Sequence, residues 1–215
     1  DPAVDIIVEL IGGTDTARDL VLAAINKGKH VVTANKALIA HHGAEIFAAA
    51  AEKKVAVAYE AAVAGGIPII KALRDGLVAN RIEWLAGIIN GTTNFILTEM
   101  RDKGRAFDDV LKEAQALGYA EADPTFDVEG IDAAHKLVIL ASIAFGMPLE
   151  IERIYTEGIT KITLEDIRYA DELGYRIKHL GIARETKDGV ELRVNPTLVP
   201  EDSLIAKVDG AKNAV

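Results

Sequence analysis

The sequence predicts an α/β fold in two parts: a half built on a parallel sheet, followed by an α+β half with a mixed sheet. Over residues 1–60, short β-branched apolar runs alternate with segments of helical period, which is typical of right-handed βαβ crossovers. Near the end of the chain, long alternating runs at 175–186 and 190–199 flank a turn at 187–189. Such a hairpin belongs to an antiparallel or mixed sheet.

The elements of the first half follow one another closely. Residues 4–10, VDIIVEL, are expected to form a buried parallel strand because the run is almost continuously apolar. The other elements expected here are a helix at 15–27, a strand at 30–34, a helix at 36–53 and a strand at 55–60. A core strand so close to the first residue suggests that the chain is a fragment that starts inside a domain.

The pattern changes after residue 65. A short helix is expected at 68–76, with Pro68 in its first turn, where proline is tolerated. The elements expected after it are a strand at 81–90, helices at 92–103, 107–117 and 131–145, a short strand near 151–155, a helix at 164–171 and the hairpin. We place a domain boundary in the glycine-rich turn at 60–68, which gives domains of residues 1–65 and 66–215.

Composition excludes several classes of function. Half of the 215 residues are apolar, enough for a sizeable core, and the net charge is −9 with acids and bases interspersed. A polyanion-binding protein needs a basic face, so nucleic acid is not an expected partner. The chain has no cysteine, which fits a cytoplasmic or organellar-matrix protein. No apolar run reaches about 18 residues, so no membrane partner is expected.

Asp132 and Lys136 are the most informative pair of charges. On a helix they lie one turn apart, and the aspartate precedes the lysine, which is the favourable order. Their neighbours in 131–145 are almost all apolar, so the pair is expected at a partly buried surface. Spacing alone leaves two readings open: a structural ion pair, or a desolvated lysine that donates a proton to a reacting oxygen.

Upstream of this pair, the carboxylates of Glu121, Asp123, Asp127 and Glu129 crowd a short segment. They either favour the positive end of the following helix, or converge to bind an ammonium group. The loop that carries Glu121 and Asp127 must pass close to Asp132. His135 points elsewhere on the helix and is expected to be a packed or surface residue.

Several loops offer backbone or side chains to a ligand. Gly12, Gly13 and Thr14 follow the first strand, and Thr33, Ala34, Asn35 and Lys36 follow the second. The carboxyl edge of a parallel sheet is where ligands bind. The loop at 60–68 is either a tight turn or a cation site built from carbonyls. Asn90 to Thr93 form either a helix cap or a substrate clamp. His41 and His42 are expected to be exposed helix residues.

Five segments resemble one enzyme family in order and spacing. They are VELIGGT, VVTANKALIA, YEAAVAGGIPI, GIINGTTNFIL and ALGYAEADPTFDVEGIDAAHK. The chain resembles the homoserine dehydrogenases, which reduce aspartate 4-semialdehyde to homoserine with NADH or NADPH, the reduced forms of NAD and NADP. The resemblance covers essentially the whole chain, and the last segment matches the family signature closely.

The resemblance implies a role for each matching position. Lys136 and Lys36 would act as general acid or base on the reacting oxygen, and Asp132 would orient Lys136 and the substrate hydroxyl. The residues implied for substrate binding are Glu121, Asp127, Thr92 and Tyr119, with Glu121 on the amino group. Those implied at the nicotinamide and ribose are Gly12, Gly13, Thr14, Thr33, Ala34, Asn35 and Lys36. The backbone positions implied for a sodium or potassium ion are Glu60, Val63, Gly65 and Ile67.

At the level of domains, the resemblance makes 1–65 the C-terminal part of a Rossmann-like dinucleotide-binding domain. Residues 66–215 would form the substrate and dimerisation domain, with a homodimer through the sheet of residues 175–199. The proposed pathway is the biosynthesis of threonine, methionine and isoleucine, in the cytoplasm.

The departures from the family concern the cofactor. The family begins with a strand and a G-x-G-x-x-G turn that holds the pyrophosphate at a helix N-terminus; the sequence contains no such motif. The opening βαβ unit and a C-terminal segment are therefore expected to be missing. The alternative to an active enzyme is an inactive fragment, or a nonenzymatic α/β binding or assembly module that keeps the substrate-domain scaffold.

Overall fold

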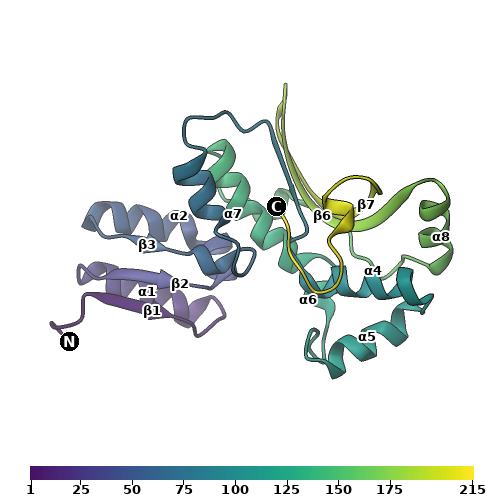
Figure 1. Ribbon diagram of the computed structural model, residues 1–215. Helices are drawn as coiled ribbons and strands as arrows, with labels where there is room; N and C mark the ends of the chain where they lie inside the picture. The colour runs from purple at the N-terminus through teal and green to yellow at the C-terminus, as the bar shows by residue number, and fades with distance from the viewer. The chain divides into compact units, whose positions relative to one another are not determined.

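The computed structural model describes residues 1–215 and shows two compact units (Figure 1). The first consists of Asp1–Ile82 and Val138–Arg153, and the second of Glu83–Leu137 and Ile154–Val215. Each unit has its own sheet. The chain therefore leaves the first unit, enters the second, returns to the first and ends in the second.

The first unit carries a parallel three-stranded sheet in the order β1-β2-β3. Its strands are β1 (Ile6–Glu9), β2 (His30–Thr33) and β3 (Val57–Ala58). Its helices are α1 (Asp15–Asn26), α2 (Lys36–Lys53) and α3 (Ile69–Lys71), which runs on into a π-helical turn at Ala72–Gly76. Side chains of α1, α2 and β2 share one core. The predicted parallel α/β arrangement is confirmed.

The prediction of a buried first strand is wrong. Ile6 and Val8 are 55% and 61% exposed, because β1 is an edge strand and the two helices cover one face of the sheet. Val32, on the neighbouring strand, is also exposed. Val31 and Thr33, the neighbours of Val32 along β2, are buried beneath the helices.

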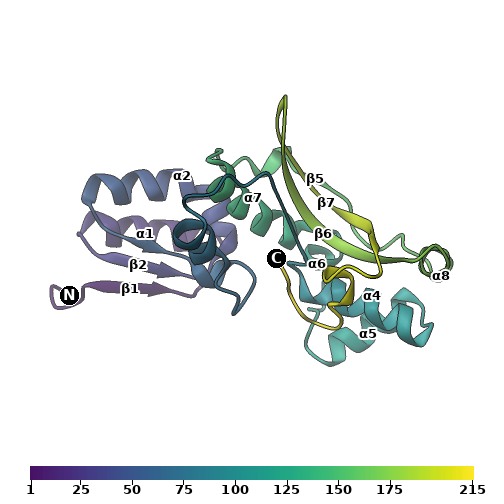
Figure 2. The same ribbon diagram turned by 45° about the horizontal axis from the view of Figure 1, so that its top comes forward.

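The second unit carries a mixed four-stranded sheet in the order β4-β6-β7-β5. Its strands are β4 (Trp84–Gly87), β5 (Tyr155–Thr156), β6 (Tyr175–Thr186) and β7 (Gly189–Pro200). β5 runs parallel to β7, while β4–β6 and β6–β7 are antiparallel. The long hairpin of β6 and β7 projects from the sheet in Figure 2. Thr186 pairs with Gly189, so its turn has two residues, and Gly189 takes a positive φ there. The predicted mixed sheet is confirmed.

Helices pack against this sheet and one another. They are α4 (Gly91–Lys103), α5 (Phe107–Ala116), α6 (Thr125–Val128) and α8 (Leu164–Glu172). Helix α7 (Ile131–Phe145) is shared by both units, and its residues from Leu137 to Ala141 are almost completely buried. Three predicted strands are shorter than expected: the strand at 55–60 has two residues, the strand at 81–90 has four, and the strand near 151–155 is mostly a 3₁₀ turn. None of the helices combines the length and the apolar character needed to cross a lipid bilayer.

Candidate active site

Asp132 and Lys136 form the predicted ion pair in the first turns of α7. Lys136 Nζ lies 2.7 Å from Asp132 Oδ2 and also donates to the carbonyl of Ile89 at 2.8 Å. The side chains are 5% and 17% exposed for Asp132 and Lys136. The aspartate side chain is thus shielded from water, and the lysine side chain is mostly buried. The arrangement suits proton transfer as well as a structural role.

Asn90 connects this pair to a second carboxylate. It is the N-cap of α4, and its Oδ1 accepts a hydrogen bond from Thr93 N at 2.8 Å. Its Nδ2 donates to Asp127 Oδ1 at 2.7 Å and to Asp132 Oδ2 at 2.9 Å. The helix cap, one of the two alternatives for this turn, is therefore present, and the same side chain also binds two of the candidate site residues.

Thr92 joins two other candidates. Its hydroxyl donates to the carbonyl of Tyr119 at 2.6 Å and lies 3.5 Å from Asp127 Oδ2. The Tyr119 ring packs edge-on against Phe95 and remains partly exposed. The structure thus gathers Thr92, Tyr119 and Asp127 around the start of α4.

Glu121 stands apart from this cluster. Its residue is exposed, and Gln115 Nε2 donates to its backbone carbonyl at 3.0 Å. Its carboxylate makes no hydrogen bond or ion pair. The backbone of the loop is therefore held in place, but the predicted convergence of Glu121 with Asp127 is not seen. The carboxylate is available to an incoming cation.

The first unit has its own group of candidates at the carboxyl edge of its sheet. Gly12 and Gly13 have φ of 80° and 69° with open space where a side chain would be, so ligand atoms can approach the backbone closely. Asn35 caps α2 through Leu38 N and donates from Nδ2 to the carbonyl of Gly13 at 2.7 Å. This bond ties the loop after β1 to the loop after β2.

The residues flanking these glycines complete the edge. Thr14 immediately precedes α1, with its hydroxyl 3.3 Å from Asp15 Oδ1. Ala34 is half-buried, as is Lys36, the first residue of α2. Lys36 belongs to the first unit and Lys136 to the second.

Glu9 is a residue that our sequence reasoning missed. It is 3% exposed at the end of β1, where its carboxylate accepts from Thr33 Oγ1 at 2.6 Å and from the amides of Ile11 and Gly12 at 2.8 and 3.3 Å. Thr33 Oγ1 in turn accepts from Asn35 N at 2.9 Å. A lone acid at the end of an apolar strand was the signal available in the sequence.

The loop at 60–68 is wound tightly. Ala64 and Gly65 both have φ of 57°, and such a conformation is uncommon for alanine. The Glu60 carboxylate accepts hydrogen bonds from the amides of Ile70 and Lys71 and so caps α3. A cation at this loop would therefore be bound by backbone carbonyls and not by this carboxylate. Val63 is buried and Ile67 half-buried. No three His, Asp or Glu side chains gather to hold a metal; a site here would rest on carbonyls.

Of the three helical histidines, His135 and His41 lie as expected, whereas His42 is less exposed than expected. His135 is buried, with its ring edge-on to Phe126 at 5.3 Å between centroids. His41 is exposed and His42 half-buried on α2, with ring centroids 6.5 Å apart. His135 therefore contributes to packing behind the face that carries Asp132 and Lys136.

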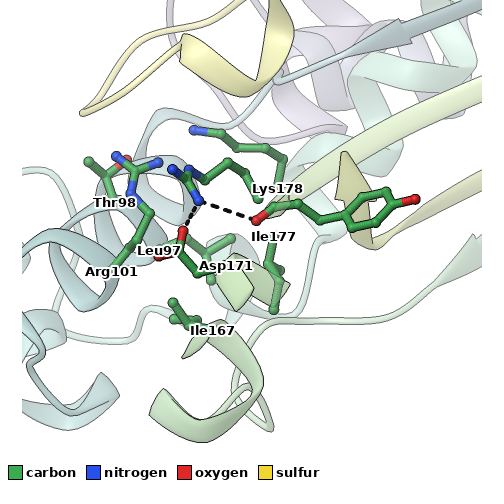
Figure 3. A pocket seen from close by; sticks show the side chains of 9 residues that line it. Leu97, Thr98, Arg101, Ile167, Asp171, Ile177 and Lys178 are labelled. Carbon is green, nitrogen blue, oxygen red and sulfur yellow. Dashed lines mark hydrogen bonds and ion pairs between the residues drawn. The ribbon is translucent and has the colours of Figure 1, made fainter. Parts of the chain in front are cut away.

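None of these candidates lines the cavity shown in Figure 3. Leu97, Thr98, Arg101, Ile167, Asp171 and Lys178 are among its lining residues, and its volume is about 10 Å³, room for one water molecule at most. Asp171 forms an ion pair with Arg176 there. The cavity is a seam between α4, α8 and β6, too small for a substrate.

Family profiles match most of the chain. The profile described as homoserine dehydrogenase matches residues 68–215, and the profile described as homoserine dehydrogenase, NAD binding domain matches residues 1–60. Together they cover both halves in which the candidate residues lie.

Individual proteins show the same similarity. The chain is 73% identical over 215 residues to a homoserine dehydrogenase of Pseudomonas aeruginosa, covering all of this chain and 50% of that protein. A solved homoserine dehydrogenase from Thiobacillus denitrificans matches with a TM-score of 0.97 and 74% identity over 99% of this chain and 49% of its own. A hyperthermophilic archaeal homoserine dehydrogenase in complex with NADPH has a TM-score of 0.83 and 30% identity, over 97% and 60% of the two chains. The chain spans about half the length of the curated relatives it matches.

Proposed function

The chain belongs to the homoserine dehydrogenase family, and from this premise we propose that a protein carrying it interconverts L-homoserine and L-aspartate 4-semialdehyde with NAD or NADP. The observation that supports the proposal most is the Asp132–Lys136 pair, which is buried on its carboxylate side and held at Ile89 and Asn90. Its distances and partial burial match what acid–base chemistry on a carbonyl requires.

Lys136 is the proposed proton donor. When a hydride adds to the aldehyde carbon, negative charge develops on oxygen, and a nearby ammonium both stabilises that charge and supplies the proton. In the reverse direction the same nitrogen accepts the proton of the homoserine hydroxyl. Asp132 keeps Lys136 in place and orients the substrate hydroxyl. Lys36, at the sheet edge of the first unit, is the proposed second lysine of this chemistry.

The substrate's charged groups are assigned to the cluster around α4. Glu121 has an exposed carboxylate with no partner in the chain, which suits a salt bridge to the substrate ammonium. Asp127, Thr92 and Tyr119 lie together beside Asn90 and would line the same site.

The glycine-rich sheet edge of the first unit is assigned to the cofactor. The open backbone at Gly12 and Gly13, anchored by Asn35, fits the approach of a nicotinamide and its ribose. Bound there, the nicotinamide supplies or takes up the hydride, while the protein provides position and charge. The residues assigned to this edge are Gly12, Gly13, Thr14, Thr33, Ala34, Asn35 and Lys36. The NADPH complex of the archaeal relative supports a nicotinamide cofactor.

Further assignments follow from family membership. The backbone of Glu60, Val63, Gly65 and Ile67 would hold a sodium or potassium ion, and residues 1–65 and 66–215 would be the nucleotide and catalytic domains. Apolar side chains on the second unit's sheet, Trp84, Tyr155 and Leu198, are exposed, as expected for a homodimer through this sheet. We place the reaction in threonine, methionine and isoleucine biosynthesis in the cytoplasm.

The deciding experiment uses a protein of the relatives' full length that carries this sequence, called here the full-length form. We expect Lys136→Ala to lower kcat for NADP-dependent homoserine oxidation by about 100-fold or more. Lys187→Ala, at the exposed hairpin turn, is the matched control and should retain wild-type rates. A kcat within about threefold of wild type in Lys136→Ala would remove the acid–base role.

The competing candidate is a nonenzymatic binding or assembly module. Calorimetry of the 215-residue chain with NADP measures whether this chain binds the cofactor by itself. We expect little or no binding, because the sequence has no G-x-G-x-x-G turn. Micromolar affinity would show that the pyrophosphate is bound in another way. A full-length form that turns over no homoserine would favour the module.

A further inference from the structure

We propose that Asn90 is a positioning residue of the active site: its two amide hydrogens set the spacing between the Asp132–Lys136 pair and the Asp127 carboxylate. This inference rests on the proposed function and goes beyond it, because the family resemblance assigned no role to Asn90. Asn90 is only 3% exposed, so its polar atoms are expected to find their partners within the protein.

The identity of the Asn90 atoms follows from their partners. The amide of Thr93 can only donate, so the atom facing it at 2.8 Å must be the side-chain oxygen. That places the NH₂ group opposite Asp127 Oδ1 and Asp132 Oδ2, two acceptors at 2.7 and 2.9 Å. The amide group has two hydrogens, and each carboxylate receives one.

The bridge has an electrostatic purpose. Two carboxylates within reach of one nitrogen repel each other. The partial positive charges of the amide hydrogens between them reduce that repulsion. Lys136 contributes a further positive charge on the Asp132 side, at 2.7 Å. Asn90 therefore lets the carboxylates of Asp127, on α6, and Asp132, on α7, remain close together.

A helix cap alone does not explain an asparagine here. Capping α4 needs one side-chain oxygen, which serine or aspartate would also supply. The amide NH₂ adds contacts to residues 37 and 42 positions away in the sequence. The neighbouring carbonyl of Ile89 holds Lys136 Nζ, so two consecutive residues of one strand-to-helix junction hold both charges of the pair.

The first test is spectroscopic and needs no activity. In ¹⁵N-labelled chain, the side-chain amide signals of Asn90 are identified by their loss in Asn90→Ser. We expect Asp127→Asn to shift mainly one amide proton and Asp132→Asn mainly the other. If neither substitution moves these signals, the bridge does not exist in solution and the proposal fails.

The second test separates positioning from capping. Asn90→Ser and Asn90→Asp keep a capping oxygen and remove the amide donors. In the full-length form we expect kcat to fall by about 10- to 100-fold in Asn90→Ser, together with some fall in Tm because buried Asp132 loses a hydrogen-bond donor. Both effects should be larger in Asn90→Asp, which adds a third carboxylate. Thr163→Ala removes the cap of α8 and should lower Tm while leaving kcat unchanged.

The outcomes of these tests separate failure of the Asn90 proposal from failure of the proposed function. An Asn90→Ser variant that loses stability and keeps wild-type kcat would show that Asn90 is a cap only, and would overturn the proposal. If the wild-type full-length form oxidises no homoserine, the proposed function fails, and the amide signals alone decide whether Asn90 spaces the two carboxylates.

Discussion

Lys178 Nζ lies 3.1 Å from Asp209 Oδ1, and this contact joins the middle of β6 to the segment that follows the 3₁₀ turn at Ile205–Lys207. The lysine is almost completely buried, while the Asp209 side chain is 44% exposed. Lys178 also donates to the carbonyl of Val208 at 2.7 Å and lies 3.3 Å from Asn94 Oδ1. A buried cation thus fastens the last residues of the chain to α4 and the sheet.

Burial has the largest effect on the pKa of Lys178. Burial lowers the pKa of Lys178 and outweighs the hydrogen bond and charge of Asp209, which act to raise it. Burial also acts to raise the pKa of Asp209, but Lys178 and Arg101 reverse that effect, so the pKa of Asp209 lies below its ordinary value. The ion pair therefore offsets the desolvation of Lys178 without exceeding it.

We expect removal of the anion to destabilise the chain more than removal of the cation. Asp209→Asn leaves a buried ammonium without its counter-charge and should cost about 1–2 kcal/mol, below the 3–5 kcal/mol of a fully buried pair because water reaches Asp209. Lys178→Met removes the charge and keeps the volume, at a cost of about 1 kcal/mol or less. Urea unfolding of both variants measures the difference, and the reverse order would refute this account.

Because of His179, we expect the free energy of unfolding to fall in mild acid. Its Nε2 lies 2.9 Å from the carbonyl of Glu157, so Nε2 carries the proton, and its buried Nδ1 has no partner. Burial lowers the pKa of His179, against the smaller opposing effects of Glu157 and Glu129. Below about pH 6.5, the ordinary histidine pKa, His179 binds a proton more readily in the unfolded chain than in the folded chain. The unfolded chain therefore binds more protons, and the free energy of unfolding declines as the pH falls.

The comparison that isolates this effect uses two substitutions. Between pH 7 and pH 5, the free energy of unfolding should fall by about 1 kcal/mol more in wild type than in His179→Gln. His41→Gln, at an exposed position of α2, should behave as wild type. Parallel pH profiles for wild type and His179→Gln would show that His179 does not cause the decline.

The sequence could predict what depends on local spacing. The Asp132–Lys136 pair and the cap at Asn90 were predicted because residues one turn apart, or at a strand-to-helix junction, meet whatever the rest of the fold does. The donation from Asn90 to both carboxylates was not, since it depends on which distant segments pack together. The exposure of β1 likewise depends on the order of the strands and on which face the helices cover.

Two glycines form a matched pair for steric predictions. A Cβ at Gly158 would lie 2.5 Å from the backbone carbonyl of Val128, whereas a Cβ at Gly43 would lie 2.5 Å from the Cδ1 end of the Leu149 side chain. Backbone cannot yield easily, but a flexible leucine can. Gly158→Ala should lower the free energy of unfolding by about 1–3 kcal/mol. Gly43→Ala should stay within about 1 kcal/mol of wild type, because improved helix propensity offsets the repacking. Equal effects in urea unfolding would contradict this reasoning.

Glu9 should control the shape of the proposed cofactor edge. Glu9→Ala removes the acceptor for Thr33 and for the amides of Ile11 and Gly12, and should cost about 1–3 kcal/mol in stability. In the full-length form we expect the KM for the cofactor to rise more than the KM for homoserine. Glu52→Ala, on the exposed side of α2, is the control. A selective rise in the homoserine KM would move Glu9 away from the cofactor.

The division of α7 has a consequence for how this sequence can be inherited. Residues up to Leu137 belong to one unit, and those from Val138 to the other. A single genetic crossover in the turn at 60–68 between diverged relatives would therefore separate the first unit from its own Val138–Arg153 segment. Recombinants that keep both units intact need junctions near 82, 137 and 153. Natural exchange and directed shuffling should consequently favour transfer of the whole region as one block.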